Sequence, residues 1–272
     1  MRKIWLCADD YAIAPAVDVA IRDLIARGRL NATSVMTAAP SFSSEAPPLG
    51  ALVAGRRAAI GLHLTLTGPF RPLTAFRPTS GCAFPPLAAM ARLAFLRRLD
   101  EAALAREIEA QLAAFAGAFG RAPDFVDGHQ HVHLFPQIRD EVLAAAKRAA
   151  PAAWIRQCGS ALPSRILIRD FKTLALSVLS RGFRQRAAAL GLATNAAFAG
   201  VYDLHPGTDF AALFPRFLEG LPEGGLVMCH PGHVDAELRR LDPLTDLRKI
   251  EYEYFASDVF LRALEAAGVE LA

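Results

Sequence analysis

The sequence predicts an α/β fold in which parallel strands, joined by helices, form an irregular (β/α) barrel. Short apolar runs alternate with longer segments whose apolar residues recur at helical spacing, a pattern typical of strand–helix–strand units. The chain has 272 residues, a length that suits one (β/α) barrel of about 250 residues. An open dinucleotide-binding sheet is disfavoured, because no GxGxxG motif follows the first apolar run.

The elements are predicted from these runs and spacings. Strands are expected at the short apolar runs 4–8, 34–36, 59–64, 124–127, 154–156 and 225–229. Helices are expected where apolar residues share one helical face, at 16–27, 101–119, 138–149 and 258–267. Gly28 is expected to end the first of these helices.

Two segments depart from the alternation. Residues 69–86 are rich in Pro, Thr and Phe and are predicted to form a long functional loop. Residues from about 159 to 204 are rich in Arg, Ala and Leu, with Gly interruptions. We expect a helical insertion or lid there, within a single catalytic domain that spans residues 1–272.

The composition excludes several classes of protein. Apolar residues make up 53% of the chain and charged residues 21%, which is ordinary for a globular protein. The net charge is +3, and the arginine clusters at 97–98, 181–186 and 239–240 are not interleaved with aromatics, so no nucleic-acid partner is expected. The four cysteines are far apart, as in a reducing compartment. We expect a cytoplasmic location and no transmembrane segment.

Polar residues follow several predicted strands at their carboxyl ends. Asp9 and Asp10 end the first strand, His63 lies in the third, residues 127–133 follow the fourth, and residues 229–233 follow the last. In a parallel α/β fold such positions face one common site. Taken singly, the two acids could be a helix cap and His63 a hydrogen-bonded core histidine. Their coincidence at four strand ends predicts an enzyme.

An Asp and two His from different strands would make a metal site with three protein ligands and an open position for water. A second carboxylate would then serve as general base and a histidine across the site as general acid. Asp9 or Asp10 and His230 are the natural candidates. Spacing alone leaves open which of the two adjacent acids has which role.

The segment 127–133 holds three of the seven histidines. If it were an extended strand, His129 and His131 would share a face about 6.6 Å apart and could chelate one ion. His133 would then lie about 13 Å from His129 and could not join the same site. At most two of these histidines are therefore expected to be ligands.

Four motifs, in order along nearly the whole chain, resemble the YdjC-like (ChbG-type) carbohydrate deacetylases. They are Ala8-Asp9-Asp10-Tyr11, the run 61–67 (Gly-Leu-His-Leu-Thr-Leu-Thr), the run 127–136 (Asp-Gly-His-Gln-His-Val-His-Leu-Phe-Pro) and Cys229-His230-Pro231-Gly232. The resemblance implies a metal-dependent hydrolase of the irregular-barrel deacetylase type. It would remove the acetyl group from an N-acetylated amino sugar, often a chitooligosaccharide. Because one branch of the family is linked to hopanoid lipid synthesis, a glycolipid precursor is included among the expected substrates.

The family motifs also imply roles for individual residues. Asp10, His63 and His129 would hold one divalent ion. Asp9 would be the base that activates water, and His230 the acid that protonates the leaving amine. Ligand chemistry favours zinc for this set, whereas the family is often described with magnesium, so both ions stay open.

Three further residues receive weaker assignments. By analogy with the polysaccharide deacetylases, Arg156 would pair with Asp9, keep it ionised and border the substrate. His131 would contact the ligands or the substrate, and His133 would be structural. Ala12 stands where the family has a glycine, which would alter the approach of the backbone at the rim of the site.

Two other functions remain as alternatives. One is another metal-dependent barrel enzyme, a phosphoesterase or an isomerase, although no Gly-rich phosphate cradle with a basic residue at a helix start is evident. The other is a sugar-binding barrel without catalysis. The sugar and the oligomeric state, a homo-oligomer included, are left open.

Overall fold

The computed structural model describes residues 1–55, 58–161, 171–205 and 207–272. Its strands are Arg2–Tyr11 (β1), Ala32–Val35 (β2), Ala59–Leu64 (β3), Phe125–Gly128 (β4), Trp154–Ile155 (β5), Phe198–Ala199 (β6), Leu226–Cys229 (β7) and Val269–Leu271 (β8). They pair in parallel in the order β5-β4-β3-β2-β1-β7-β6, and β8 pairs with the first residues of β1.

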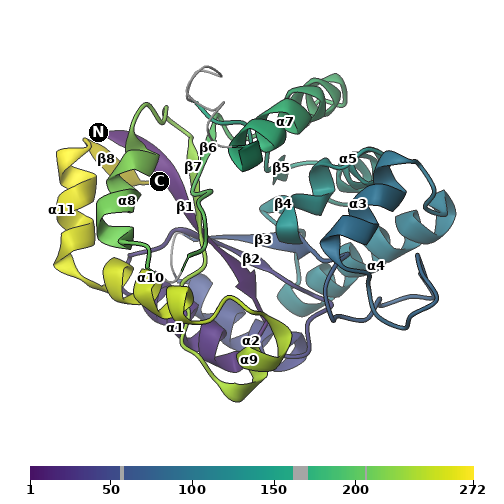
Figure 1. Ribbon diagram of the computed structural model, residues 1–272, viewed down its shortest axis with the longest axis horizontal. Helices are drawn as coiled ribbons and strands as arrows, with labels where there is room; N and C mark the ends of the chain where they lie inside the picture. The colour runs from purple at the N-terminus through teal and green to yellow at the C-terminus, as the bar shows by residue number, and fades with distance from the viewer. Residues whose placement is uncertain (56–57, 162–170, 206) are drawn as a thin grey trace.

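Helices lie outside the curved sheet (Figure 1). They are Pro15–Ala26 (α1), Phe42–Val53 (α2), Leu87–Phe95 (α3), Glu101–Phe119 (α4), Ile138–Ala149 (α5), Phe171–Ala189 (α7), Phe210–Leu218 (α8), Ala236–Leu241 (α9), Asp246–Ala256 (α10) and Asp258–Ala266 (α11), with a short 3₁₀ segment, His129–Leu134 (η1). Sequential contacts of α1 with α2, α2 with α4, α4 with α5 and α5 with α7 make the outer layer continuous.

The sheet is a parallel α/β half-barrel whose two edge strands, β5 and β6, are linked by backbone and side-chain contacts of the segments next to them. A parallel bridge links Ile155 to Thr194, and the Ile155 N–H donates to the Ala193 carbonyl at 2.8 Å. Beside it, the Asn195 amide accepts a hydrogen bond from the Gln157 N–H at 2.8 Å and donates one to the Gln157 carbonyl at 3.0 Å. Asn195 thus adds side-chain hydrogen bonds to the backbone contacts at this seam. The predicted irregular parallel architecture is confirmed.

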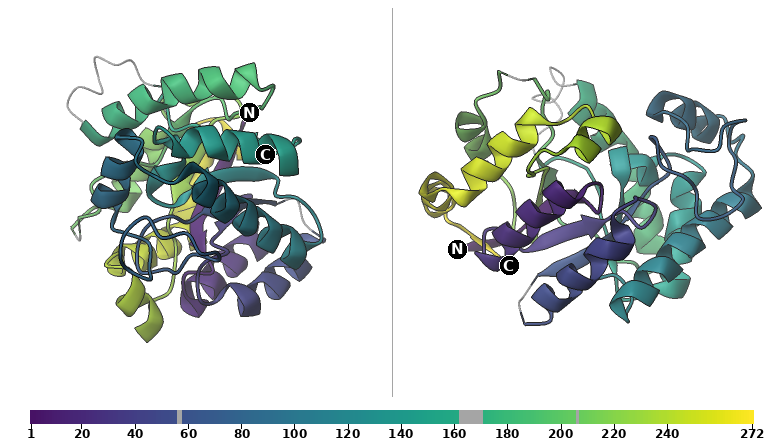
Figure 2. Two further views of the ribbon diagram at one scale, coloured as in Figure 1. Left: turned by 90° about the vertical axis from the view of Figure 1, so that its right-hand side faces the viewer. Right: turned by 90° about the horizontal axis from the view of Figure 1, so that it is seen from below.

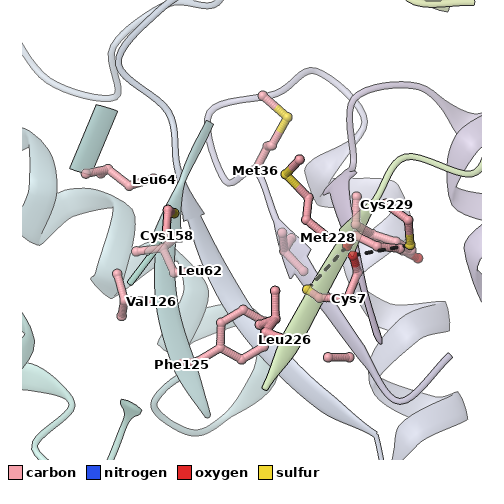
Figure 3. Close-up of a cluster of buried hydrophobic side chains, with 14 of the residues drawn as sticks. Cys7, Met36, Leu62, Leu64, Phe125, Val126, Cys158, Leu226, Met228 and Cys229 are labelled. Atoms are coloured by element: carbon pink, nitrogen blue, oxygen red, sulfur yellow. Dashed lines mark hydrogen bonds between the residues drawn. The ribbon is translucent and has the colours of Figure 1, made fainter. Parts of the chain in front are cut away.

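The interior of the half-barrel is filled by the apolar runs that predicted the strands. On β3, Gly61 lies opposite Phe125 of β4, and a Cβ at Gly61 would lie 2.3 Å from the Phe125 ring. Only glycine leaves room for this ring, which stacks on Trp154 of β5 at 4.3 Å between ring centroids. Figure 3 shows Phe125 in a cluster with Leu62 of β3 and Leu226 of β7.

The predicted strands and helices are present, with their ends shifted by a few residues. Residues 69–86 contain neither helix nor strand, so the predicted loop is confirmed. Sequence analysis did not predict β6, β8, α2, α3, α8, α9 and α10. Helix α2 contains Pro47 and Pro48, which disfavour helix by propensity, and the burial of Leu49 and Ala46 outweighs that penalty.

The proposed insertion at about 159–204 falls partly on residues 162–170, which lie outside the described residues. Its described part contains α7, which packs against α5 and η1, and strand β6. A lid role for this segment and the single-domain organisation stay predictions. No helix in the described part of the chain is long and apolar enough to cross a membrane.

Candidate metal and catalytic site

Three of the predicted site residues lie together at the carboxyl edge of the sheet. Asp10 near the end of β1, His63 of β3 and His129 just after β4 offer ligand atoms that all lie within 4.8 Å of one another. The Asp10 Oδ1 atom is 2.8 Å from His129 Nδ1 and 3.2 Å from His63 Nε2. All three side chains are buried.

Both acids of the first motif reach the site because β1 is irregular at its end. Its register with β2 shifts between Ala8 and Tyr11, and Asp10 has a φ of 65°. Neighbouring residues of a regular strand point to opposite faces, whereas a bulge re-aims side chains. Asp9 and Asp10 are therefore both available to one site.

The donor set fits a divalent cation. Asp127, in register with His63 on the neighbouring strand, places Oδ1 2.6 Å from His63 Nδ1 and leaves Nε2 directed at Asp10. Such a carboxylate–histidine pair is a usual support for a metal-binding imidazole. Burial opposes a charge on His63, but Asp127 and Asp10 outweigh it and raise the His63 pKa to about 10. The position therefore favours positive charge, which a metal ion would supply in place of the proton.

Asp9 is held by a buried arginine. Arg156 Nη1 and Nη2 donate to the two Asp9 carboxylate oxygens at 2.6 and 2.7 Å, and the guanidinium is 0% exposed. Burial acts to raise the Asp9 pKa, but Arg156 outweighs it, so the pKa stays well below its ordinary value. The expected Arg156–Asp9 pair is present. Arg156 is fully buried, and its expected contact with the substrate stays a prediction.

A second group of potential ligands, Cys7, Asp9 and Asp127, also clusters in the interior. The Arg156 guanidinium already occupies it, with Nη2 at 3.0 Å from Cys7 Sγ and 2.6 Å from Asp127 Oδ2. These three side chains therefore hold the Arg156 guanidinium group. Asp127 joins the Arg156–Asp9 pair to His63 in one buried charge network.

Sequence analysis missed Arg248, which lies on α10. Its Nη2 donates to Asp10 Oδ2 at 2.6 Å and to Asp242 Oδ2 at 2.7 Å, and the side chain is fully buried. Burial opposes ionisation of Asp10, but His129 and Arg248 outweigh it and hold the Asp10 pKa well below its ordinary value. No local pattern distinguishes Arg248 from the exposed arginines, since its partner Asp10 is far away in the sequence.

His230 follows β7, as predicted, and is half-buried. Its backbone N–H donates to Glu251 Oε2 at 2.6 Å, while the Tyr202 hydroxyl donates to Glu251 Oε1 at 2.6 Å. Within the described residues, the buried His230 Nδ1 has no hydrogen-bond partner. A charge on His230 contributes to lowering the Asp9 pKa. Glu251, also missed from the sequence, thus holds the loop that carries His230.

The histidine run is not an extended strand, so the expected pairing of His129 and His131 on one strand face is wrong. Strand β4 ends at Gly128, and Gln130 and His131 have φ values of 53° and 59°. The turn sends His131 toward Cys158, with Nδ1 3.6 Å from Sγ. Burial lowers the His131 pKa to about 3. His133 is fully buried and its Nε2 donates to the Arg156 carbonyl at 2.9 Å, in keeping with a structural role.

A pocket of about 460 Å³ opens beside His129. Its walls come from the predicted loop, from the segment after β1, from the first turn of α3 and from the end of α9. The lining residues are Ile13, Gly68, Pro69, Phe70, Ala83, Phe84, Pro86, Leu87, His129, Gln130, Leu241, Asp242 and Pro243. The pocket is large enough for a small organic ligand and borders the ligand cluster through His129.

Fold and site together define a class: a parallel α/β half-barrel with an Asp/His/His cluster and a paired second carboxylate at its carboxyl edge. A peptidoglycan N-acetylglucosamine deacetylase shares the fold, with a TM-score of 0.51 and 10% identity over 99% of this chain and 85% of the other. A putative cellobiose-phosphate cleavage protein from Enterococcus faecalis V583 is more similar, with a TM-score of 0.76 and 22% identity over 100% and 97% of the two chains.

The chain belongs to the family described as YdjC-like protein, which matches residues 3–266. A chitooligosaccharide deacetylase from Yersinia pestis (strain Pestoides F) is 27% identical over 249 residues, which cover 88% of this chain and 85% of the relative. The family assignment made from four short motifs is therefore confirmed.

Proposed function

We propose that this protein is a metal-dependent carbohydrate N-deacetylase that hydrolyses the acetamido group of an N-acetylated amino sugar. One observation carries the proposal: Asp10, His63 and His129 converge beside the buried Asp9–Arg156 pair. The name of the Yersinia pestis relative, chitooligosaccharide deacetylase, supports a sugar amide as substrate.

Asp10, His63 and His129 would hold one divalent ion, which when bound supplies a Lewis acid for the amide carbonyl and for water. The Asp/His/His donors favour zinc, with magnesium as the alternative. Asp127 contacts His63 Nδ1 and so orients the imidazole with Nε2 toward Asp10. Arg248 binds Asp10 Oδ2 and so leaves Oδ1 on the side of the two histidines.

Two residues would move the protons. Asp9 accepts a proton from the attacking water, and its ion pair with Arg156 keeps it ionised and aimed. His230, which follows β7 and is half-buried, donates a proton to the amine nitrogen as the C–N bond breaks. The Glu251 contact to the His230 backbone fixes the loop and leaves the imidazole unengaged.

The substrate would occupy the pocket beside His129. Phe70, Phe84 and Leu87 give it apolar walls, which suit the faces of sugar rings and the acetyl methyl group. We assign chitooligosaccharides as the first substrates to test. A glycosylated lipid precursor, as in the hopanoid-associated branch, is the second. His131 is not among the residues that line the pocket and contacts Cys158, so its proposed role is support of the site.

We also propose a cytoplasmic location and one catalytic domain. Cys7, Cys82, Cys158 and Cys229 are all free thiols, three of them buried, which suits a reducing compartment.

The activity is tested with protein that has been stripped of metal and reloaded with zinc, magnesium, manganese or cobalt. N-acetylglucosamine oligomers and a glycolipid carrying the same sugar are offered, and released acetate is measured. We expect acetate release with at least one ion. Asp9→Asn should lower kcat by about 10²–10⁴-fold while leaving metal content unchanged, whereas His63→Ala and His129→Ala should lower metal content itself.

Three outcomes would contradict the proposal. Absence of acetate with every ion and every N-acetyl sugar would remove the deacetylase assignment and favour a binding barrel. Acetate release that survives both His63→Ala and His129→Ala would remove the metal assignment. Release of phosphate from sugar phosphates without acetate release would support the phosphoesterase alternative.

A further inference from the structure

One long segment of the chain is free of acidic residues. Residues 46–99 contain no Asp or Glu, although the chain as a whole has 27. The same segment contains seven arginines, against a net charge of only +3 for the whole protein. The segment therefore has a net charge of +7, and five of its arginines lie in the pocket loop, in helix α3 or directly after α3.

Several of these arginines are exposed and unpaired. Arg71, Arg92 and Arg98 are exposed and make no ion pair with any described residue. Arg97 binds Asp140 and Glu101 only loosely, at 3.4 and 3.6 Å. Surface arginines usually pair with nearby carboxylates, and residues 46–99 contain no carboxylate.

Large apolar side chains are exposed beside these charges. Phe95 is 50% exposed, Leu96 57%, Leu87 36% and Leu73 44%. One face of the Phe95 ring packs near Phe135, at 5.6 Å between ring centroids, which fixes the ring while leaving half of it in solvent. Figure 2 shows α3 at the periphery of the molecule, away from the sheet.

A groove of about 720 Å³ lies between α3 and the loop beneath it. Arg92 and Arg98 line it together with Thr79 and Leu96. It begins at the first turn of α3, where Ala88 lines the groove and Leu87 lines the pocket next to His129. The basic groove and the mouth of the site are thus neighbours on one face.

We propose that this face docks the protein on an anionic lipid bilayer. Phosphate headgroups would bind Arg92 and Arg98 in the groove, while Phe95 and Leu96 enter the interfacial region. Charge complementarity selects an anionic partner. Exposed Phe and Leu side chains next to arginines select a partner with an apolar interior rather than a polyanion, because a polyanion would leave that apolar surface in water.

The test is co-sedimentation of the metal-free and metal-loaded protein with vesicles, without any sugar substrate. We expect binding to phosphatidylcholine vesicles that contain phosphatidylglycerol, little binding to phosphatidylcholine alone, and loss of binding as salt is raised. Because no turnover is measured, this result does not depend on the deacetylase assignment.

Two double variants locate the surface. Arg92→Gln with Arg98→Gln should weaken partitioning about 25-fold, or about five-fold for each arginine removed. Phe95→Ser with Leu96→Ser should weaken it about ten-fold or more at unchanged charge. Matched controls lie elsewhere on the surface: Arg239→Gln with Arg240→Gln on α9, and Val259→Ser with Leu261→Ser on α11, where Val259 and Leu261 are 43% and 46% exposed. Thermal unfolding verifies that each variant is folded.

Three outcomes would overturn the proposal. The first is absence of binding to anionic vesicles at low ionic strength. The second is binding that the α9 and α11 controls weaken as much as the α3 variants do. The third is a concentration-dependent dimer, or tight binding to heparin, that the α3 variants abolish while vesicles are not bound; the surface would then serve a second copy of the chain or an acidic polymer.

Discussion

Ala12 shows how a single residue can carry backbone strain next to a functional site. It has a φ of 79°, is fully buried, and donates its N–H to Asp18 Oδ1 at 2.6 Å. An L-residue disfavours this left-handed region by about 1–2 kcal/mol, whereas glycine adopts it freely. The sequence indicated that position 12 is unusual, because the family has a glycine there. Only the structure shows that Ala12 has a strained backbone conformation.

Ala12→Gly should relieve this strain. Its matched control is Ala14→Gly, which removes another fully buried methyl group where φ is −159° and no strain exists. Both changes increase the conformational entropy of the unfolded chain by the same amount. The free energy of unfolding of Ala12→Gly should therefore exceed that of Ala14→Gly by about 1–2 kcal/mol in urea titrations. Equal destabilisation by the two changes would show that the conformation at Ala12 is unstrained.

At the scale of elements, α4 fixes the loop that borders the pocket. The Glu107 carboxylate, 0% exposed, accepts hydrogen bonds from Leu73 N–H at 3.0 Å, Thr74 N–H at 2.9 Å and the Thr74 hydroxyl at 2.7 Å. One turn later, Gln111 binds both backbone groups of Thr65. The composition of residues 69–86 predicted a loop. That the buried Glu107 carboxylate orders this loop follows only from the packing of the fold.

Glu107→Gln should loosen this loop, because an amide cannot accept all of these hydrogen bonds. We expect a loss of about 1–3 kcal/mol in the free energy of unfolding and faster chymotryptic cleavage of the loop after Leu73 and Phe76. The control is Glu109→Gln on the exposed face of α4, where the pair with Arg148 is half-exposed and its removal should change little. Unchanged cleavage in Glu107→Gln would mean that the loop is held by its apolar contacts alone.

At the scale of the whole molecule, Asp18 links the stability of the fold to pH. Burial raises its pKa to about 8, a shift that the Ala12 N–H opposes and the nearby Glu45 and Asp235 reinforce. The folded state thus binds a proton more tightly than the unfolded state. Its contribution to stability is present below the ordinary carboxyl pKa of about 4 and is lost as pH rises toward about 8.

Asp18→Asn should remove this dependence, since an amide resembles the protonated acid and does not ionise. The free energy of unfolding of Asp18→Asn minus that of the unchanged protein should therefore become more positive between about pH 5 and about pH 9. Urea titrations of both proteins across this range measure the difference. A difference that is flat with pH would show that Asp18 is ionised throughout.

The sequence by itself determined the parallel α/β architecture, the family, and the carboxyl-edge location of Asp10, His63, His129 and His230. These follow from local periodicity and from motifs that lie at strand ends, and both are properties of neighbouring residues. Local patterns carry no information on where distant segments of the chain meet, so Arg248 and Glu251 on α10 were missed.

Only the tertiary structure decided how the site is arranged. The bulge at the end of β1 brings both Asp9 and Asp10 to one site, and the turn after Gly128 separates His129 from His131. Buried charges must find partners wherever the fold brings them together, so Arg248 reaches from α10 to Asp10. Pairings of this kind depend on three-dimensional proximity, which the spacing of residues along the chain does not encode.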